Sequence, residues 1–322
     1  MPTTERPTSA RTLRTARTPG AAPPGVSRRG FLAAGGLGVA LAAVACAPRP
    51  TTSAPPATPS RLLVELESLE RASGVTIGLH AEDLVTHRAV THRAEQSFPM
   101  CSLFKALAVG ALLRAHSPYD DYWQTGIAFT PDDVVVDSPV TSVTTTWVMT
   151  PSELADAALR FSDNTAGNLL LRELGGPGGV TDLARTLGAT STRLDRWEPE
   201  LNEAVPGDPR DTTTPGDVAL LYRRLLVDDT LGVLGQARLR DWMLRSTTSG
   251  ERLRAATGAG IEVADKTGAG AYGVVNDAGV VWRPDGSPTV VAVLTRTDDA
   301  TAENDNAVVA ETARLALEEL AR

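Results

Sequence analysis

The chain has 322 residues, of which 42% are hydrophobic and 22% are charged, and its formal net charge is −8. This composition excludes a disordered polyampholyte, a collagen-like fibre and a protein with many membrane spans. The segment 1–60 holds seven arginines and one acid, so the rest of the chain is more acidic than the whole and has a net charge of −14. A domain this acidic is repelled by nucleic acid and by anionic lipid, and we expect no nucleic-acid partner.

Residues 1–46 have the layout of an export signal. Arg28 and Arg29 precede an apolar run over residues 31–45 that is too short to span a bilayer as a stable helix. The arginine pair has serine before it and Phe-Leu after it. It resembles a twin-arginine signal, whose pathway exports folded proteins.

Two processing routes remain open at the end of this signal. The run Ala43-Val44-Ala45-Cys46 fits a small-residue cleavage site, and it also fits a lipobox with Cys46 as the lipidation candidate, although Ala43 stands where leucine is usual. Residues 47–60 are rich in proline and threonine, so we expect a disordered linker. The working domain is then expected over residues 61–322, secreted or anchored by lipid on the outer face of the cytoplasmic membrane.

The working domain opens with alternating helical and strand patterns. Leucines at helical spacing predict a helix over residues 62–73, and the alternation of Val75, Ile77 and Leu79 predicts a strand. A second strand is expected over residues 84–91. The apolar stretch 103–113 has almost no polar side except Lys105, which predicts a helix buried on all sides.

Helices fill the middle of the chain and strands return near its end. We expect helices over residues 151–161, 164–174, 179–187, 215–226, 235–245 and 301–320. We expect strands over residues 262–266, 272–282 and 289–297, with a hairpin turn at Pro284-Asp285-Gly286. The pattern predicts an α+β fold in which both chain ends form one antiparallel sheet and a helical lobe is inserted between them. The helical lobe is placed at about 100–246, and the α/β lobe at about 61–99 and 247–322.

Lysine usage singles out two positions. The chain contains 29 arginines but only two lysines, Lys105 and Lys266. Arginine cannot readily lose its proton, whereas a buried lysine can approach neutrality and act as a base. Ser102 lies three residues before Lys105, so the hydroxyl and the amine share one helix face. A serine at a helix start also lies at the positive end of the helix dipole, although this short pattern alone is weak.

Three further segments strengthen the signal. Ser162-Asp163-Asn164, then Glu198, then Lys266-Thr267-Gly268 follow Ser102 in this order along the chain. The serine, S-D-N and K-T-G set is typical of class A β-lactamases and penicillin-binding proteins. The chain resembles a class A serine β-lactamase of actinobacterial type over about residues 61–322. The resemblance lies in the spacing of these segments and in the run from Leu194 to Glu203.

The resemblance implies roles for these side chains. Ser102 would attack the lactam carbonyl, with its own N–H and that of Ala269 holding the oxyanion. Ser162 would pass a proton to the leaving nitrogen, with Lys105 and Lys266 keeping that relay polarised. The implied substrate-binding residues are Asn164, Asn202, Thr267, Gly268, Ala269 and Arg252, of which Arg252 precedes the K-T-G segment.

Glu198 separates hydrolysis from capture of the substrate. With Asn202 it would hold the water that frees the acyl-serine, and penicillin-binding transpeptidases lack this glutamate. Whether Lys105 or Glu198 takes the Ser102 proton during acylation stays open. The loop that carries Glu198 resembles the family's omega loop, with Arg196 and Asp211 as its closing ion pair and a cis bond before Pro199.

The chain departs from the family pattern at the cleft. Asp137 stands where relatives usually have an aromatic residue, and a carboxylate there is expected to repel anionic substrates. Cys101 precedes the nucleophile as in some carbapenem-hydrolysing members, but Gly270 occupies the partner position, so their disulfide cannot form. The small wall Ala269-Gly270-Ala271 favours a narrow, penicillin-preferring site.

The leading hypothesis is an exported, monomeric β-lactamase that opens penicillins and some cephalosporins and confers antibiotic resistance. We expect no metal and no cofactor, since His80, His87, His92 and His116 lack ligand spacing. One alternative is a D-Ala-D-Ala peptidase or penicillin-binding protein of the same fold. Another is a wall-associated binding module without activity.

Overall fold

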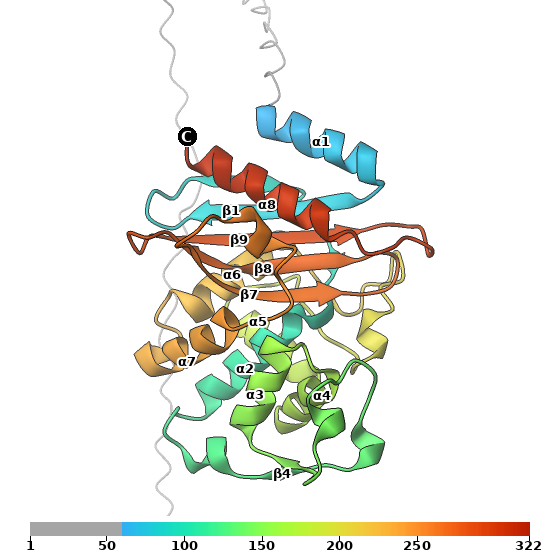
Figure 1. Cartoon of the computed structure of the whole chain (residues 1–322), viewed down its shortest axis with the longest axis vertical. Coiled ribbons are helices and arrows are strands. Elements are labelled where there is room, and N and C mark those ends of the chain that lie inside the picture. Colours follow the sequence, from blue (N-terminus) through green and yellow to red (C-terminus); the bar gives the residue numbers. More distant parts are fainter. Residues whose placement is uncertain (1–59) are drawn as a thin grey trace, which may run out of the picture. The chain divides into compact units, whose positions relative to one another are not determined.

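A five-stranded sheet in the order β2-β1-β9-β8-β7 organises the computed structural model, which describes residues 60–322 (Figure 1). All neighbouring strands run antiparallel. The strands are β1 (Thr76–Asp83), β2 (Ala89–His92), β7 (Glu262–Ala269), β8 (Val275–Trp282) and β9 (Pro288–Arg296). The expected signal, Cys46 and the linker up to residue 59 lie outside the described residues.

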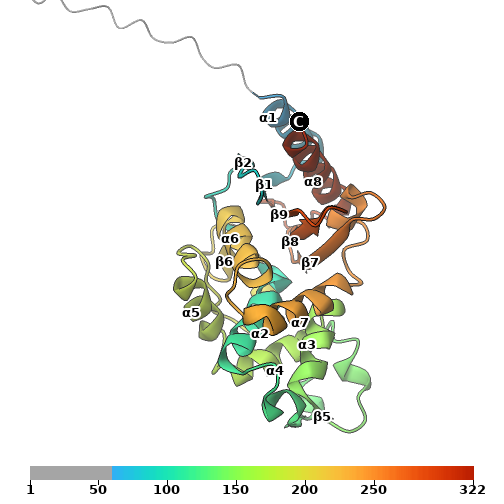
Figure 2. The ribbon, with the colours of Figure 1, turned by 90° about the vertical axis from the view of Figure 1, so that its left-hand side faces the viewer.

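Alternating side chains of the strands face two separate cores. On β9, Val291 and Val293 pack into the core beneath the terminal helices, whereas Val290, Ala292 and Leu294 pack into the core of the helical part. Helices α1 (Arg61–Ser73) and α8 (Asn306–Leu320) cover the first face, and α6 (Pro215–Leu226) lies against the second (Figure 2). Both faces of the sheet are therefore buried.

The remaining helices lie on the α6 side of the sheet (Figure 1). They are α2 (Phe104–Ala115), α3 (Pro151–Arg160), α4 (Asn164–Glu173), α5 (Gly178–Thr186) and α7 (Gly232–Leu244). Helix α2 runs through their centre, and its side chains from Phe104 to Gly110 are all buried, as the apolar stretch predicts. The α+β fold with helices inserted between the two ends of one sheet is confirmed.

Two short strand pairs escaped the sequence analysis. Strand β3 (Phe98–Pro99) pairs with β6 (Thr212–Thr213), and β4 (Ile127–Ala128) pairs with β5 (Val148–Met149). Pairs this short do not show alternation. The β3–β6 pair matters for the site, because it joins the segment before Ser102 to the end of the omega loop.

Three of the expected boundaries were wrong, two of them because the side chain of an aspartate bonds to the backbone there. The strand expected over 84–91 is confined to β2, since the carboxylate of Asp83 accepts hydrogen bonds from Val85 N and Thr86 N and turns the chain. Strand β8 begins at Val275 rather than Tyr272, whose φ is 54°. Helix α8 starts at Asn306, capped by Asp305, rather than at residue 301.

No helix in the described part of the chain is long and apolar enough to cross a membrane.

Candidate active site

Ser102 lies in a 3-10 turn, Cys101–Leu103, that leads directly into α2. Lys105 follows one helical turn later, and its Nζ donates a hydrogen bond to Ser102 Oγ over 2.9 Å. The backbone on either side of Ser102 is fixed: Met100 N donates to Asp211 O, and the hydroxyl of Tyr222 donates to Leu103 O. The serine hydroxyl is thus held by elements from distant parts of the chain.

The amine of Lys105 is the centre of the polar contacts. It donates to Asn164 Oδ1 and to the carbonyl oxygen of Ser162, both over 2.7 Å, and it lies 3.0 Å from Glu198 Oε1. Both side chains of this ion pair are 0% exposed. Gly167 on α4 makes room for the lysine, because a Cβ there would lie 2.9 Å from Lys105 Cε. A buried pair of this kind depends on its additional hydrogen bonds.

Glu198 approaches the same hydroxyl from the omega loop. Ser102 Oγ lies 3.3 Å from Glu198 Oε1, and the amide of Asn202 donates to Glu198 Oε2. The backbone of Glu198 is bonded twice to one side chain on α4, since its N–H donates to Asn168 Oδ1 and its carbonyl accepts from Asn168 Nδ2, both over 2.9 Å. The Glu198-Pro199 bond is cis. Asn168 was not anticipated from the sequence, because nothing marks a lone asparagine on a helix.

Lys266 reaches the site from β7. Its Nζ donates to Ser162 Oγ over 3.0 Å and to Thr267 O over 2.9 Å. Burial and the positive charges of Lys105 and Arg252 hold the pKa of Lys266 well below its usual value. Ser162 has a φ of 58°, which is an uncommon backbone conformation. In this conformation its hydroxyl lies between the amines of the two lysines.

Arg252 lies behind β7 and lines the same cleft. Its guanidinium donates to Gly268 O over 2.8 Å and to Asn276 O over 2.9 Å, so it is fixed against the K-T-G strand. Burial lowers the pKa of Arg252. The hydroxyls of Thr248 and Thr267 are 2.6 Å apart on the same wall. Thr248 and Asn276 carry no motif, so the sequence analysis missed them.

Two buried carboxyl groups support this wall from behind. Asp265 accepts hydrogen bonds from the guanidinium of Arg254, and Asp277 accepts one from Leu253 N. Burial and the negative charge of Asp265 raise the pKa of Asp277 well above its usual value.

The opposite wall is held by Asp163, the middle residue of the S-D-N motif. Its fully buried carboxylate accepts hydrogen bonds from Val140 N, Thr141 N and Ala166 N over 2.8 to 2.9 Å. Asp163 thereby caps α4 and ties the loop around residues 135–141 to that helix. Asp163 was expected as part of the motif, but this capping role was not.

These walls enclose an open cleft of about 660 Å³ with Ser102 on its surface. The cleft is lined by residues of both the sheet and the helical part: Ser102, Val135, Val136, Asp137, Ser138, Pro139, Ser142, Phe161, Ser162, Asn164, Asn202, Thr248, Arg252, Thr267, Gly268 and Ala269. A hydroxyl beside an amine and a carboxylate, with cations along one wall, suits nucleophilic attack on a carbonyl compound that carries a negative charge. Among residues 60–322 no group of three or more histidine, cysteine, aspartate and glutamate side chains is placed to hold a metal ion.

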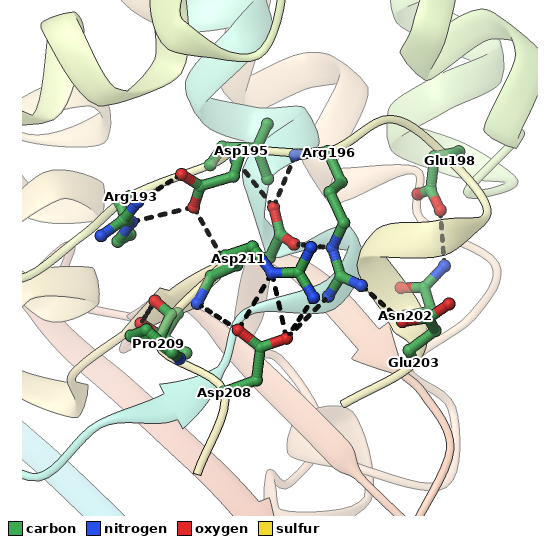
Figure 3. A network of polar contacts seen from close by, with 12 residues as sticks. Arg193, Asp195, Arg196, Glu198, Asn202, Glu203, Asp208, Pro209 and Asp211 are labelled. Carbon is green, nitrogen blue, oxygen red and sulfur yellow. Dashed lines mark hydrogen bonds and ion pairs between the residues drawn. The ribbon is translucent and has the colours of Figure 1, made fainter. Parts of the chain in front are cut away.

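The omega loop is closed by a polar network (Figure 3). Arg196 Nε donates to Asp211 Oδ2 over 2.6 Å, and the other oxygen of Asp211 accepts from the backbone N–H groups of Asp195 and Arg196. Figure 3 shows Asp208 and Glu203 beside the same guanidinium. The ion pair expected from the sequence is present, and it sits at the two ends of the loop that carries Glu198.

The structure also places the residues that depart from the family pattern. Asp137 lines the cleft and is exposed. Cys101 is a free, buried thiol whose pKa is raised by burial. A Cβ at Gly270 would lie 2.9 Å from Cys101 Sγ, so Gly270 stands directly opposite the cysteine, as the sequence analysis inferred.

Comparison with known proteins identifies the class. The model of a family described as "Beta-lactamase enzyme family" matches residues 61–320. Beta-lactamase AST-1 of Nocardia asteroides is 47% identical over 252 residues, which cover 78% of this chain and 81% of the relative. The solved β-lactamase of Streptomyces albus G is 44% identical, covers 81% of this chain and 99% of its own, and superposes with a TM-score of 0.79. A variant of an ancestral Gram-negative class A β-lactamase is 43% identical with a TM-score of 0.78, over 81% and 99% of the two chains.

These matches, on this fold and around this cleft, define an enzyme that hydrolyses β-lactams. The chain belongs to the β-lactamase enzyme family, as a class A member.

Proposed function

We propose that the chain hydrolyses the β-lactam amide of penicillins, and of some cephalosporins, through an acyl-serine on Ser102. One observation carries the proposal: Ser102 Oγ lies 2.9 Å from Lys105 Nζ and 3.3 Å from Glu198 Oε1 at an open cleft. A hydroxyl with a base on either side can be deprotonated for attack, and its ester can later be attacked by an activated water.

In the acylation step Ser102 Oγ forms a bond to the lactam carbonyl carbon, and the lactam C–N bond breaks. The serine proton passes to Lys105 or Glu198, both of which are in reach of Ser102 Oγ. The leaving nitrogen takes a proton from Ser162 Oγ, which is resupplied along the contacts from Lys105 and Lys266. Ser162 accepts from both amines, so it is suited to this relay.

In the deacylation step a water attacks the acyl carbon and gives its proton to Glu198. The Ser102–acyl bond then breaks, and Ser102 Oγ takes from Glu198 the proton that the water gave up. Asn202 donates to Glu198 and lines the cleft, so it fixes the carboxylate on the side from which the water comes. The two hydrogen bonds between the Asn168 side chain and the Glu198 backbone, one donated and one accepted by Asn168, position this base beside the ester.

The wall from Lys266 to Ala269 orients the substrate. Lys266, Thr267 and Arg252 offer positive charge and hydroxyl groups to the substrate carboxylate. Because Ala269 and Gly270 are small, this wall of the cleft has no bulky side chain, which favours the compact ring system of penicillins.

The test is a kinetic and mass-spectrometric comparison with benzylpenicillin and a chromogenic cephalosporin. We expect turnover by the parent, loss of about 10³-fold or more in kcat for Ser102→Ala, and no adduct on that variant. Glu198→Ala should acylate and keep the adduct, visible as a mass increase equal to that of the intact substrate. Turnover by Glu198→Ala at the parental rate would refute the water-activating role.

We also propose that the protein is exported by the twin-arginine route and acts outside the cytoplasmic membrane, either free or anchored through Cys46. The support is the sequence of residues 27–46 alone. Replacing Arg28 and Arg29 by lysine should leave active enzyme in the cytoplasm. Detergent-phase partitioning that is lost in Cys46→Ser would indicate the lipid anchor, and unchanged partitioning would exclude it.

A further inference from the structure

One charged side chain of the cleft has no part in the proposed chemistry. Asp137 is exposed at the cleft, where it lies among the lining residues together with Asn164 and Ser162. Within residues 60–322 its carboxylate takes part in no ion pair and in no hydrogen bond, whereas its backbone is firmly bonded. An unpaired charge on a hydrogen-bonded stretch of backbone at the cleft is available to act on the substrate.

The backbone of Asp137 is held by the residue that also contacts the catalytic lysine. Asn164 N donates to Asp137 O over 3.0 Å, and Asn164 Nδ2 donates to Val136 O over 3.0 Å. The side-chain oxygen of the same Asn164 accepts from Lys105. The position of Asp137 is therefore tied to the position of the reacting centre through one side chain.

The neighbouring loop is clamped as well. Val135 N donates to Thr165 Oγ1 over 2.9 Å, Ser138 Oγ lies 2.8 Å from the same hydroxyl, and Asp163 holds the two residues after Pro139. Hydrogen bonds therefore hold the backbone on both sides of Asp137.

The charges that line the cleft are separated. Asp137 belongs to the wall bonded to α4, and Arg252 belongs to the wall bonded to β7; the other lining residues are uncharged. Beneath them, Lys105 and Glu198 form an ion pair and compensate each other, while Lys266 adds positive charge on the β7 side. A bound molecule thus meets a cationic wall on one side and a single anion on the other.

We infer that Asp137 is a specificity-determining residue that selects β-lactams by the charge of their acylamino side chain. It favours substrates with an ammonium group beside the side-chain amide and disfavours substrates with a carboxylate there. The inference rests on the proposed function, in which the ring carboxylate points to Lys266 and Arg252 and the side-chain amide points to Asn164. A substituent next to that amide leaves the cleft beside Asp137.

Three penicillins test this with one carbon skeleton. Benzylpenicillin carries hydrogen at the α-carbon of its side chain, ampicillin an amino group, and carbenicillin a carboxylate. We would measure kcat/KM for each at pH about 6, below the usual pKa of an α-amino group, with the parent and with Asp137→Asn. Asparagine keeps the size of the side chain and tolerates the φ of 56° at this position.

We expect the substitution to lower kcat/KM for ampicillin about threefold, to raise it for carbenicillin about threefold, and to change it least for benzylpenicillin, which has no charge at that carbon. The size follows from Coulomb's law for unit charges roughly 7 Å apart in water. The ratio of kcat/KM for ampicillin to that for carbenicillin then falls about tenfold, mostly through KM. In the parent, rising salt should lower the same ratio, because it screens the charge of Asp137.

The matched control is Asp132→Asn, which removes the same charge from an exposed residue of the preceding turn that does not line the cleft. The inference is overturned if the ratio stays constant in Asp137→Asn, or if Asp132→Asn changes it equally. Failure of the parent to hydrolyse benzylpenicillin would instead refute the proposed function, so the two failures are distinguishable.

Discussion

Arg196 and Asp211 join the two ends of the omega loop, with 2.6 Å between Arg196 Nε and Asp211 Oδ2. Asp211 is 1% exposed, and its carboxylate accepts hydrogen bonds from two backbone N–H groups in addition to the guanidinium. Met100 N, just before the segment of the nucleophile, donates to the backbone oxygen of the same Asp211. One residue therefore connects the loop of the general base to the segment of the nucleophile.

Arg196→Ala should slow deacylation more than acylation. Without the guanidinium the Asp211 carboxylate is left buried and unpaired, and the loop that carries Glu198 loses its closure. We expect kcat for benzylpenicillin to fall on the order of tenfold with accumulation of acyl-enzyme, because a small displacement of a catalytic group has effects of this size. Stopped-flow acylation and intact mass after quenching measure the two steps separately.

Arg193→Ala is the matched control for that variant. Arg193 pairs with Asp195 on the same loop, but its side chain is 45% exposed, so the pair contributes little. Equal effects of the two substitutions on deacylation would contradict the special position of the Arg196–Asp211 pair.

Asn168→Leu should act on Glu198 alone. The substitution removes both hydrogen bonds to the Glu198 backbone while keeping a side chain of similar size on α4. The base would lose its fixed position, and we expect a lower kcat because deacylation slows more than acylation. Thermal unfolding followed by circular dichroism distinguishes this from a general loss of stability; an unchanged kcat would show that the loop is positioned without Asn168.

The pH profile should reveal Lys266. Its pKa is lowered by burial and by the charges of Lys105 and Arg252, so the amine loses its proton at a lower pH than an exposed lysine, for which the pKa is about 10.4. Deprotonation removes positive charge from the substrate-carboxylate wall, so kcat/KM should fall as pH rises through this lowered value. Lys266→Arg keeps the charge and should move the alkaline limb upward. A limb at the same pH in both proteins would assign it to another group.

Gly270→Cys should permit a disulfide with Cys101. The new Cβ would lie 2.9 Å from Cys101 Sγ, but also 2.8 Å from Asn202 O, so the strand end must shift slightly. We expect an oxidised variant whose proteolytic map contains a peptide crosslinked to Cys101. Gly270→Ser adds similar bulk without a thiol and separates crowding of Asn202 from the effect of the bond. Absence of the crosslink under mild oxidant would show that the shift is too costly.

Much of this site could be predicted from the sequence, because the chemistry requires rare residue types. The chain has only two lysines beside 29 arginines, and this imbalance marks both lysines as candidates. Ser102, Ser162 and Glu198 lie at the family's spacing from them. The structure brings all five together, with contacts from 2.7 to 3.5 Å that link Lys105 to its partners. Their individual roles stay predictions until the kinetics are measured.

The supporting residues could not be predicted, for a physical reason. Asn168, Thr248 and Asn276 act through tertiary hydrogen bonds between elements far apart in the chain, and no local pattern records such a partner. The same holds for boundaries: the carboxylate of Asp83 accepts two backbone N–H groups and forms the turn after β1, so the second strand begins at Ala89 rather than at residue 84. Long periodic segments such as α2 were clear because many residues contribute to one signal.

The pairing of β1 with β9 has a consequence for biosynthesis. Thr76 lies opposite Arg296, a partner near the other end of the chain that the ribosome adds much later. During translation β1 therefore emerges long before the strand that shields its edge, and the nascent chain carries unpaired backbone groups at its front for most of synthesis. Ser102, just before α2, is likewise synthesised long before Lys266 on β7. The enzyme can become active only after nearly the whole polypeptide has left the ribosome, and this order of events gives chaperones a long window in which to bind.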